Sequence, residues 1–65
     1  MTFDELCSLL EALGFEASQD GTSHRKFHKE GVSELLNLQR DKNGKAKPYQ
    51  VKQVRELLNK YKLDL

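Results

Sequence analysis

The chain has 65 residues, 32% of them charged and 37% hydrophobic, which is typical of one small folded domain and excludes a disordered chain or a large enclosed substrate pocket. The net charge is +1, but the two signs of charge are segregated along the chain: residues 1–20 hold five acidic and no basic side chains, whereas residues 21–65 hold all eleven Lys and Arg. This segregation favours a surface that binds an anionic partner. No apolar run approaches the ~18 residues of a membrane span and the N-terminus lacks a signal-peptide pattern, so we expect a cytoplasmic protein.

The N-terminal segment has the pattern of an amphipathic helix. Thr2 and Glu5 are spaced as a capping box. Apolar residues then recur at helical spacing, at Phe3, Leu6, Leu10 and Leu13, and Gly14 follows as the left-handed stop. We therefore predict a helix over about residues 3–13. Cys7, the single cysteine, falls on its apolar side, which indicates a buried structural thiol in a reducing compartment.

Between residues 15 and 39 the apolar period changes to two, which predicts three strands. The first covers residues 15–20, with Phe15, Ala17 and Gln19 alternating with polar residues. Turns at Asp20-Gly21 and Glu30-Gly31 then separate strands over 23–29 and 33–39. Alternation predicts that Phe27, Leu36 and Leu38 face the helices, and that His24, Lys26 and His28 face the opposite, open side.

The C-terminal third begins with a basic loop and continues as a helix. Residues 40–47 contain a turn signal at Asn43-Gly44, and Pro48 suits the first turn of a helix that we expect to end near Lys62. Lys47, before this proline, offers no capping oxygen. The expected apolar face consists of Val51, Val54, Leu58 and Tyr61. We expect both tyrosines, Tyr49 and Tyr61, to pack against the protein, with base stacking as an alternative for Tyr49.

Together these elements predict a single domain, residues 1–65, of the α+β class. The order is α-β-β-β-α, with a three-stranded antiparallel meander and both helices packed on one face of the sheet. This is the arrangement of the double-stranded-RNA-binding-like fold.

The segment Gly21-Thr22-Ser23-His24 and the strand after it hold the residues best suited to chemistry. RNA cleavage requires a base for the 2′-hydroxyl proton, an acid for the leaving 5′-oxygen, and cations on the phosphate. His24 supplies either proton transfer near neutral pH, and Lys26 supplies a cation on the same strand face. The backbone N–H groups around Gly21 and Thr22 suit a phosphate. His24, His28 and Asp20 lack the spacing of a metal site, so we expect neither a metal nor another cofactor.

Several motifs in this order resemble the HicA toxins, small mRNA interferases of type II toxin–antitoxin systems. The resemblance covers about residues 3–62 and depends on the Gly-Thr-Ser-His element at 21–24, on Leu36-Asn37-Leu38-Gln39, and on residues 44–51 with their Lys-Pro-Tyr-Gln-Val segment. It implies an RNA endonuclease that cleaves mRNA with His24 as the catalytic residue, and a HicB-type antitoxin partner that covers the active surface.

The predicted RNA-binding residues surround His24 along the chain. They are Gly21, Thr22, Ser23, Lys26, His28, Lys45 and Lys47. His28 is about 13 Å from His24 along a strand, too far to share one proton transfer, and we expect it to contact solvent or RNA. The loop at 40–47 fits a solvated linker as well as an RNA clamp.

Two other classes of function remain open. The first is a non-catalytic RNA-binding domain that uses the same basic sheet face for phosphate contacts. The second is a protein-interaction module whose sheet face or edge strand receives a partner. Substitution of His24 separates the nuclease from the first class, and binding to RNA at low salt separates both from the second.

Overall fold

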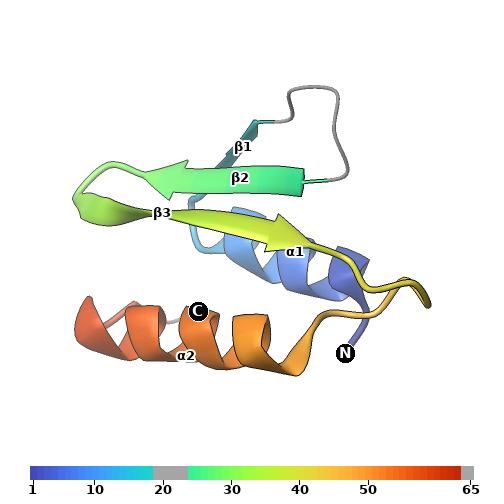
Figure 1. The fold of residues 1–65 in the computed structure, drawn as a ribbon. Coiled ribbons are helices and arrows are strands. Elements are labelled where there is room, and N and C mark those ends of the chain that lie inside the picture. Colours follow the sequence, from blue (N-terminus) through green and yellow to red (C-terminus); the bar gives the residue numbers. More distant parts are fainter. Residues whose placement is uncertain (19–23, 64–65) are drawn as a thin grey trace.

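The computed structural model describes residues 1–18 and 24–63 and has the predicted α-β-β-β-α order. The elements are α1 (Phe3–Ala12), β1 (Glu16–Ser18), β2 (His24–Lys29), β3 (Val32–Gln39) and α2 (Pro48–Lys60). Figure 1 shows the sheet as one layer and the two helices as a second layer on one side of it. The predicted fold class is therefore confirmed. Among the described residues, neither helix has the length and apolar character that would let it cross a membrane.

The sheet is antiparallel, with the strands in the order β1-β2-β3. Lys26 in the central strand lies opposite Ser18 of β1 and Asn37 of β3, and His24 lies opposite Gln39. The pairing of β2 with β3 becomes irregular between Phe27 and Lys29, next to the turn that joins these strands. This register decides which side chains become neighbours on each face of the sheet.

Helix α1 begins and ends where its local sequence predicts. The Glu5 N–H donates to the Thr2 hydroxyl oxygen at 3.1 Å, and the Thr2 N–H donates to the Glu5 carboxylate at 2.8 Å. The two bonds complete the capping box, and the Thr2 backbone N–H on the Glu5 carboxylate holds the pKa of Glu5 below its usual value. At the other end Gly14 has a φ of +96°, a left-handed conformation that glycine adopts at little cost.

The hydrophobic core lies between the two layers. It contains Phe3, Leu6, Cys7, Leu10, Phe15, Phe27, Leu36, Leu38, Ala46, Val54 and Leu57. Phe27 and Leu36 are opposite each other on β2 and β3, and both are completely buried, as the strand alternation predicts. Burial raises the pKa of the Cys7 thiol, which agrees with the prediction of a structural cysteine.

The first strand, predicted over residues 15–20, is present at Glu16–Ser18, and residues 19 and 20 lie outside the described part of the chain. Its side chains alternate as predicted, because Ala17 pairs with Phe27 of the helix-facing side, but their burial does not. Phe15, immediately before β1, is buried, whereas all three residues of Glu16–Ser18 are exposed. The strand is short and lies at an edge of the sheet, so Ala17 remains exposed although it pairs with the buried Phe27.

Helix α2 is rotated from the predicted orientation, so that Gln50, Val54 and Leu57 are its buried residues. Val51, Leu58 and Tyr61 of the predicted face pack at the margin of the core and are partly exposed. The rotation turns Gln50 toward the end of β3, where its side-chain oxygen accepts a hydrogen bond from the Gln39 N–H at 3.3 Å. The helix ends at Lys60, two residues before the predicted end.

The two tyrosines differ in their surroundings, so the packing prediction is correct for only one of them. Tyr61 is half-buried, and its hydroxyl bonds Glu34 and lies 3.1 Å from the Ser33 hydroxyl. Tyr49 is 64% exposed at the start of α2. Position 61 lies beside β3, whereas position 49 lies on the solvent side of the first turn of α2.

The loop at 40–47 is ordered by its own turn and by the N-terminus. One carboxylate oxygen of Asp41 accepts from the N–H groups of Asn43 and Lys45, each at 2.8 Å, and these bonds lower the pKa of Asp41. The Phe3 N–H donates to the Gly44 carbonyl at 3.1 Å. The loop is therefore attached to the start of α1, at the end of the molecule where both helices begin (Figure 1).

Candidate nucleic-acid interface on the open sheet face

We use the term open face for the side of the sheet that points away from the helices. Phe27, Leu36 and Leu38 are buried on the helix side, so the alternate residues of the same strands project from the open face. Arg25 supports this assignment, because its guanidinium lies 5.8 Å from the centre of the Phe3 ring on the helix side. The described residues of the open face are Glu16, Ser18, His24, Lys26, His28, Leu35, Asn37 and Gln39.

The first row across the open face contains His24. This histidine is the first residue of β2, it is half-buried, and it lies opposite Gln39, the last residue of β3. His24 therefore stands at the end of the sheet from which the loop at 40–47 leaves. A ring at the end of a strand remains within reach of a polymer that lies on the sheet.

The middle row contains Lys26, with Ser18 on one side and Asn37 on the other. An ammonium, a hydroxyl and a carboxamide are all hydrogen-bond donors, and such groups bind phosphate oxygens in protein–nucleic acid interfaces. Both neighbours are exposed, whereas Lys26 is half-buried. Sequence reasoning missed Ser18 and Asn37 because only the strand register brings them beside Lys26.

The third row contains His28 and Glu16, whose Nε2 and Oε2 atoms lie 3.1 Å apart. Both side chains are mostly exposed, 52% for His28 and 79% for Glu16. His28 lies four positions after His24 along β2, which corresponds to a distance of about 13 Å. The two histidines therefore lie in separate places on the open face, as expected from the sequence.

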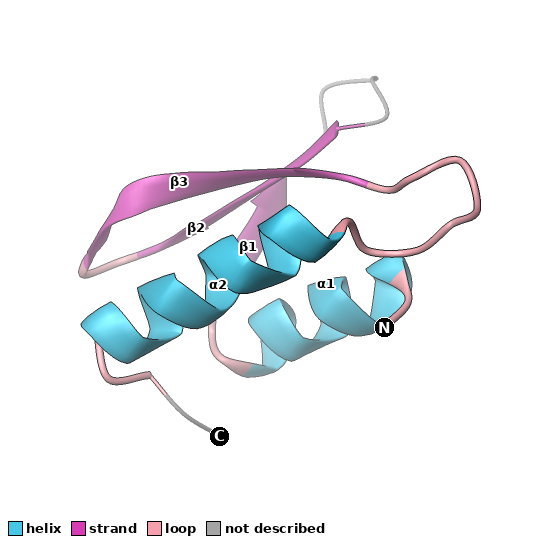
Figure 2. Cartoon of the chain, turned by 60° about the horizontal axis from the view of Figure 1, so that its bottom comes forward, coloured by secondary structure: helices cyan, strands magenta, loops and turns pink. Residues whose placement is uncertain are grey.

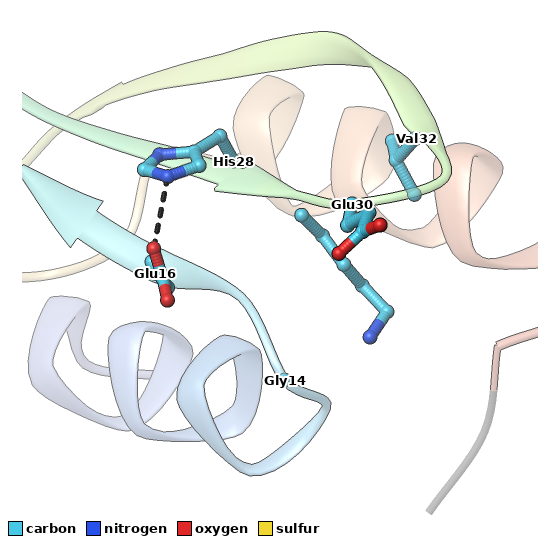
Figure 3. Close-up of a pocket in the computed structure, with 6 residues that line it drawn as sticks. Gly14, Glu16, His28, Glu30 and Val32 are labelled. Carbon is cyan, nitrogen blue, oxygen red and sulfur yellow. Dashed lines mark hydrogen bonds and ion pairs between the residues drawn. The ribbon is translucent and has the colours of Figure 1, made fainter.

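A broad open pocket of about 590 Å³ lies beside His28 (Figure 3). His28 is near the end of β2 and His24 is its first residue, so the pocket and His24 lie toward opposite ends of the sheet. Its lining consists of Gly14, Glu16, His28, Lys29, Glu30 and Val32. The Lys29 side chain extends toward Gly14, and its ammonium would lie 2.7 Å from a Cβ atom at that glycine. The pocket mixes two carboxylates with an ammonium and an imidazole, a combination that does not select an anionic ligand.

The cations predicted for a single face are in fact divided among several surfaces. On the open face Lys26 is the one lysine or arginine among the described residues, and Glu16 opposes its charge. Arg25 and Arg40 lie on the helix side, where both guanidinium groups contact the Phe3 ring. The expected single basic face is therefore not found, because the Lys and Arg side chains are distributed over β2, the loop at 40–47 and α2.

The two lysines of the loop that were predicted to bind RNA, Lys45 and Lys47, lie at the same end of the molecule as His24, outside the open face. Lys45 is exposed and pairs with Thr2 at the start of α1. Lys47 is half-buried and precedes α2 without a side-chain cap. An RNA strand on the open face would have to extend past the end of β3, at Gln39, to contact these two lysines.

Some predicted elements lie outside the described residues. Gly21, Thr22 and Ser23, with the phosphate-binding turn proposed for them, belong to this part. Within residues 1–18 and 24–63, no three His, Cys, Asp or Glu side chains are grouped as metal ligands.

Comparison of the chain with protein-family models, curated proteins and solved structures finds no match in any of the three. The resemblance to the HicA toxins therefore stays a prediction from the sequence motifs.

Proposed function

We propose that this protein is an RNA endonuclease of the HicA type, the toxin of a type II toxin–antitoxin system, with His24 as its catalytic acid and base. It acts in the cytoplasm on mRNA, and its cleavage of messages stops translation and growth. The observation that carries the proposal is the position of His24 and Lys26 on one strand and on the same open face.

The spacing of these two residues suits one nucleotide. Two strand positions correspond to about 7 Å, so a phosphate held at Lys26 leaves the neighbouring ribose near the imidazole of His24. Ser18 and Asn37 flank Lys26 and supply further donors to the phosphate oxygens. The helices lie on the other side of the sheet and leave this surface accessible (Figure 1).

The reaction follows from the acid–base chemistry of one imidazole. Neutral His24 takes the proton of the 2′-hydroxyl, and the 2′-oxygen attacks the adjacent phosphorus. The bond from phosphorus to the 5′-oxygen breaks, and the protonated imidazole returns its proton to that oxygen. Lys26 offsets the charge that develops on the non-bridging oxygens. The products are a 2′,3′-cyclic phosphate and a 5′-hydroxyl, and no metal takes part.

A HicB-type antitoxin would neutralise this activity by covering His24 and Lys26. The single lysine among the described residues of the open face favours an antitoxin that inserts a segment with an acidic group over Lys26. Such a complex excludes RNA sterically. A saturated complex that still cleaves RNA would contradict this mode of inhibition.

A non-catalytic RNA-binding domain is the second candidate. The row Ser18–Lys26–Asn37 favours it, because these side chains hold a phosphate without transferring a proton. The two candidates differ in the role of His24. They agree on the role of Lys26, so substitutions at Lys26 do not separate them.

Induced expression in a bacterial host separates the two candidates. We expect the wild-type chain to arrest growth and His24→Ala to permit it, at equal protein levels. Lys52→Ala is the matched control, because Lys52 is exposed on α2, in the layer on the other side of the sheet from His24. Equal growth arrest by the wild type and His24→Ala would reject catalysis by His24 and would favour the binding domain.

A further inference from the structure

A shallow groove separates the two helices on the outside of the helix layer. It has a volume of about 160 Å³, and its lining comes from both helices and the N-terminus: Met1, Leu6, Leu9, Val51, Val54, Arg55 and Leu58. Six of these seven side chains are apolar, and no strand residue is among them. Figure 2 shows α1 and α2 side by side on this side of the molecule.

The groove leaves apolar surface uncovered. Met1 is 60% exposed, and Leu9, Val51 and Leu58 are half-buried along the two edges of the groove. Such a strip on a chain of 65 residues is a candidate for association, since small domains bury a limited fraction of their surface.

The charges beside the groove are of opposite sign on the two helices. Helix α1 carries Asp4, Glu5 and Glu11 and no basic side chain, and Glu5 lies one turn before Leu9. Helix α2 carries Lys52, Arg55 and Lys60 against Glu56. Arg55 lies one turn after Val51 and lines the groove itself.

We propose that a second copy of this chain covers the groove, with α1 of each copy packed on α2 of the other. Figure 1 shows that both helices start at the end of the molecule that holds the loop at 40–47. A two-fold axis along the groove therefore places the acidic helix of one copy over the basic helix of its partner. A two-fold axis across the helices would instead place α1 on α1 and oppose like charges.

This association does not depend on the proposed nuclease activity. The interface uses the helix layer, and the open face of each copy points away from it. Each subunit therefore keeps His24 and Lys26 accessible. Association also adds buried apolar surface to a small domain, so the dimer should unfold at a higher temperature as the protein concentration rises.

Sedimentation equilibrium of the full chain, from micromolar to submillimolar concentration, tests the proposal. We expect the mass to rise from 7.5 kDa toward twice that value. Arg55→Glu should weaken association at least about tenfold, because it opposes two acidic surfaces. Lys42→Glu makes the same change of charge in the exposed turn after β3 and should leave the dissociation constant unchanged. Higher salt should weaken the wild-type dimer.

Two results would overturn the proposal. One is a chain that remains at the monomer mass at the highest concentration. The other is a dimer whose dissociation constant rises equally in Arg55→Glu and Lys42→Glu, because only Arg55 lies in the proposed interface. Circular dichroism of both variants checks that each is folded. In NMR spectra, the amide chemical shifts that change on dilution should belong to residues of α1 and α2. Changes confined to the strands would also contradict the groove interface.

Discussion

The imidazole of His28 and the carboxylate of Glu16 form a cross-strand pair, with 3.1 Å between Nε2 and Oε2. The pair orients His28 at the end of the open face that is distant from His24. The two histidines of the chain therefore have different surroundings, although both belong to β2 and project on the same side.

Replacement of His28 by alanine should have little effect on RNA cleavage. An exposed ion pair contributes about 0–1 kcal/mol, so the fold should remain intact, and the ring is too far from His24 to share its proton transfer. The measurement is the rate of cleavage of a labelled RNA by His28→Ala and by wild type. A loss as large as that of His24→Ala would move the catalytic site to the Glu16–His28 pair.

Acid should destabilise the protein partly through Glu34. Hydrogen bonds from Lys60, at 2.6 Å, and from the Tyr61 hydroxyl lower the pKa of Glu34 from 4.5 to about 2. A lowered pKa stabilises the folded state above the unfolded pKa near 4.5, and this stabilisation is lost as the pH falls toward 2.

The check is urea unfolding of the wild type and Glu34→Gln between neutral pH and pH 2. The wild type should be the more stable protein at neutral pH, and the two free energies of unfolding should converge as the pH falls below 4.5. A difference that stays constant over this range would contradict the assigned role of the carboxylate charge.

Gln50 should matter for stability although it is polar. It is 4% exposed, and its oxygen accepts the Gln39 N–H at the end of β3. Gln50→Ala should lower the free energy of unfolding by about 1–3 kcal/mol, because the partly buried Gln39 N–H loses its acceptor and the packing of the buried Gln50 side chain is lost. Gln53→Ala, at an exposed position of the same helix, should change it by less than about 0.5 kcal/mol. Equal effects in thermal or urea unfolding would show that the Gln50 bond contributes nothing.

Neighbouring leucines in β3 should differ sharply on substitution. Leu36 is completely buried between the layers, whereas Leu35 is 54% exposed on the open face. Leu36→Ala should lower the free energy of unfolding by about 2–5 kcal/mol through the cavity that it leaves. Leu35→Ala should change it by less than about 0.5 kcal/mol. Similar values for the two variants would contradict the register of the strand.

Much of the fold was predictable because local signals agree with it. The capping box at Thr2 and Glu5, the left-handed Gly14 and the alternation around Phe27 each act within a few residues. The rotation of α2 was not predicted from the apolar spacing. It buries the polar Gln50, whose oxygen accepts the N–H of Gln39, eleven residues earlier in the chain, and no helical pattern shows such a contact.

The candidate site was likewise only partly predictable from the sequence. His24 and Lys26 were found from the sequence because strand alternation places them on one face. Ser18 and Asn37 were missed, since only the register with β1 and β3 makes them neighbours of Lys26. The distribution of charge was also missed, because a net value for a segment does not state which surface each side chain faces.

Cleavage of a short labelled RNA by purified wild type and His24→Gln, in the presence of a metal chelator, decides whether His24 is the catalytic residue. We predict wild-type products with 2′,3′-cyclic phosphate ends, no cleavage where the attacking ribose is replaced by 2′-deoxyribose, and a loss of about 10²–10⁴-fold in the variant. Equal rates for the two proteins, or cleavage of the 2′-deoxy substrate at the wild-type rate, would contradict this role of His24.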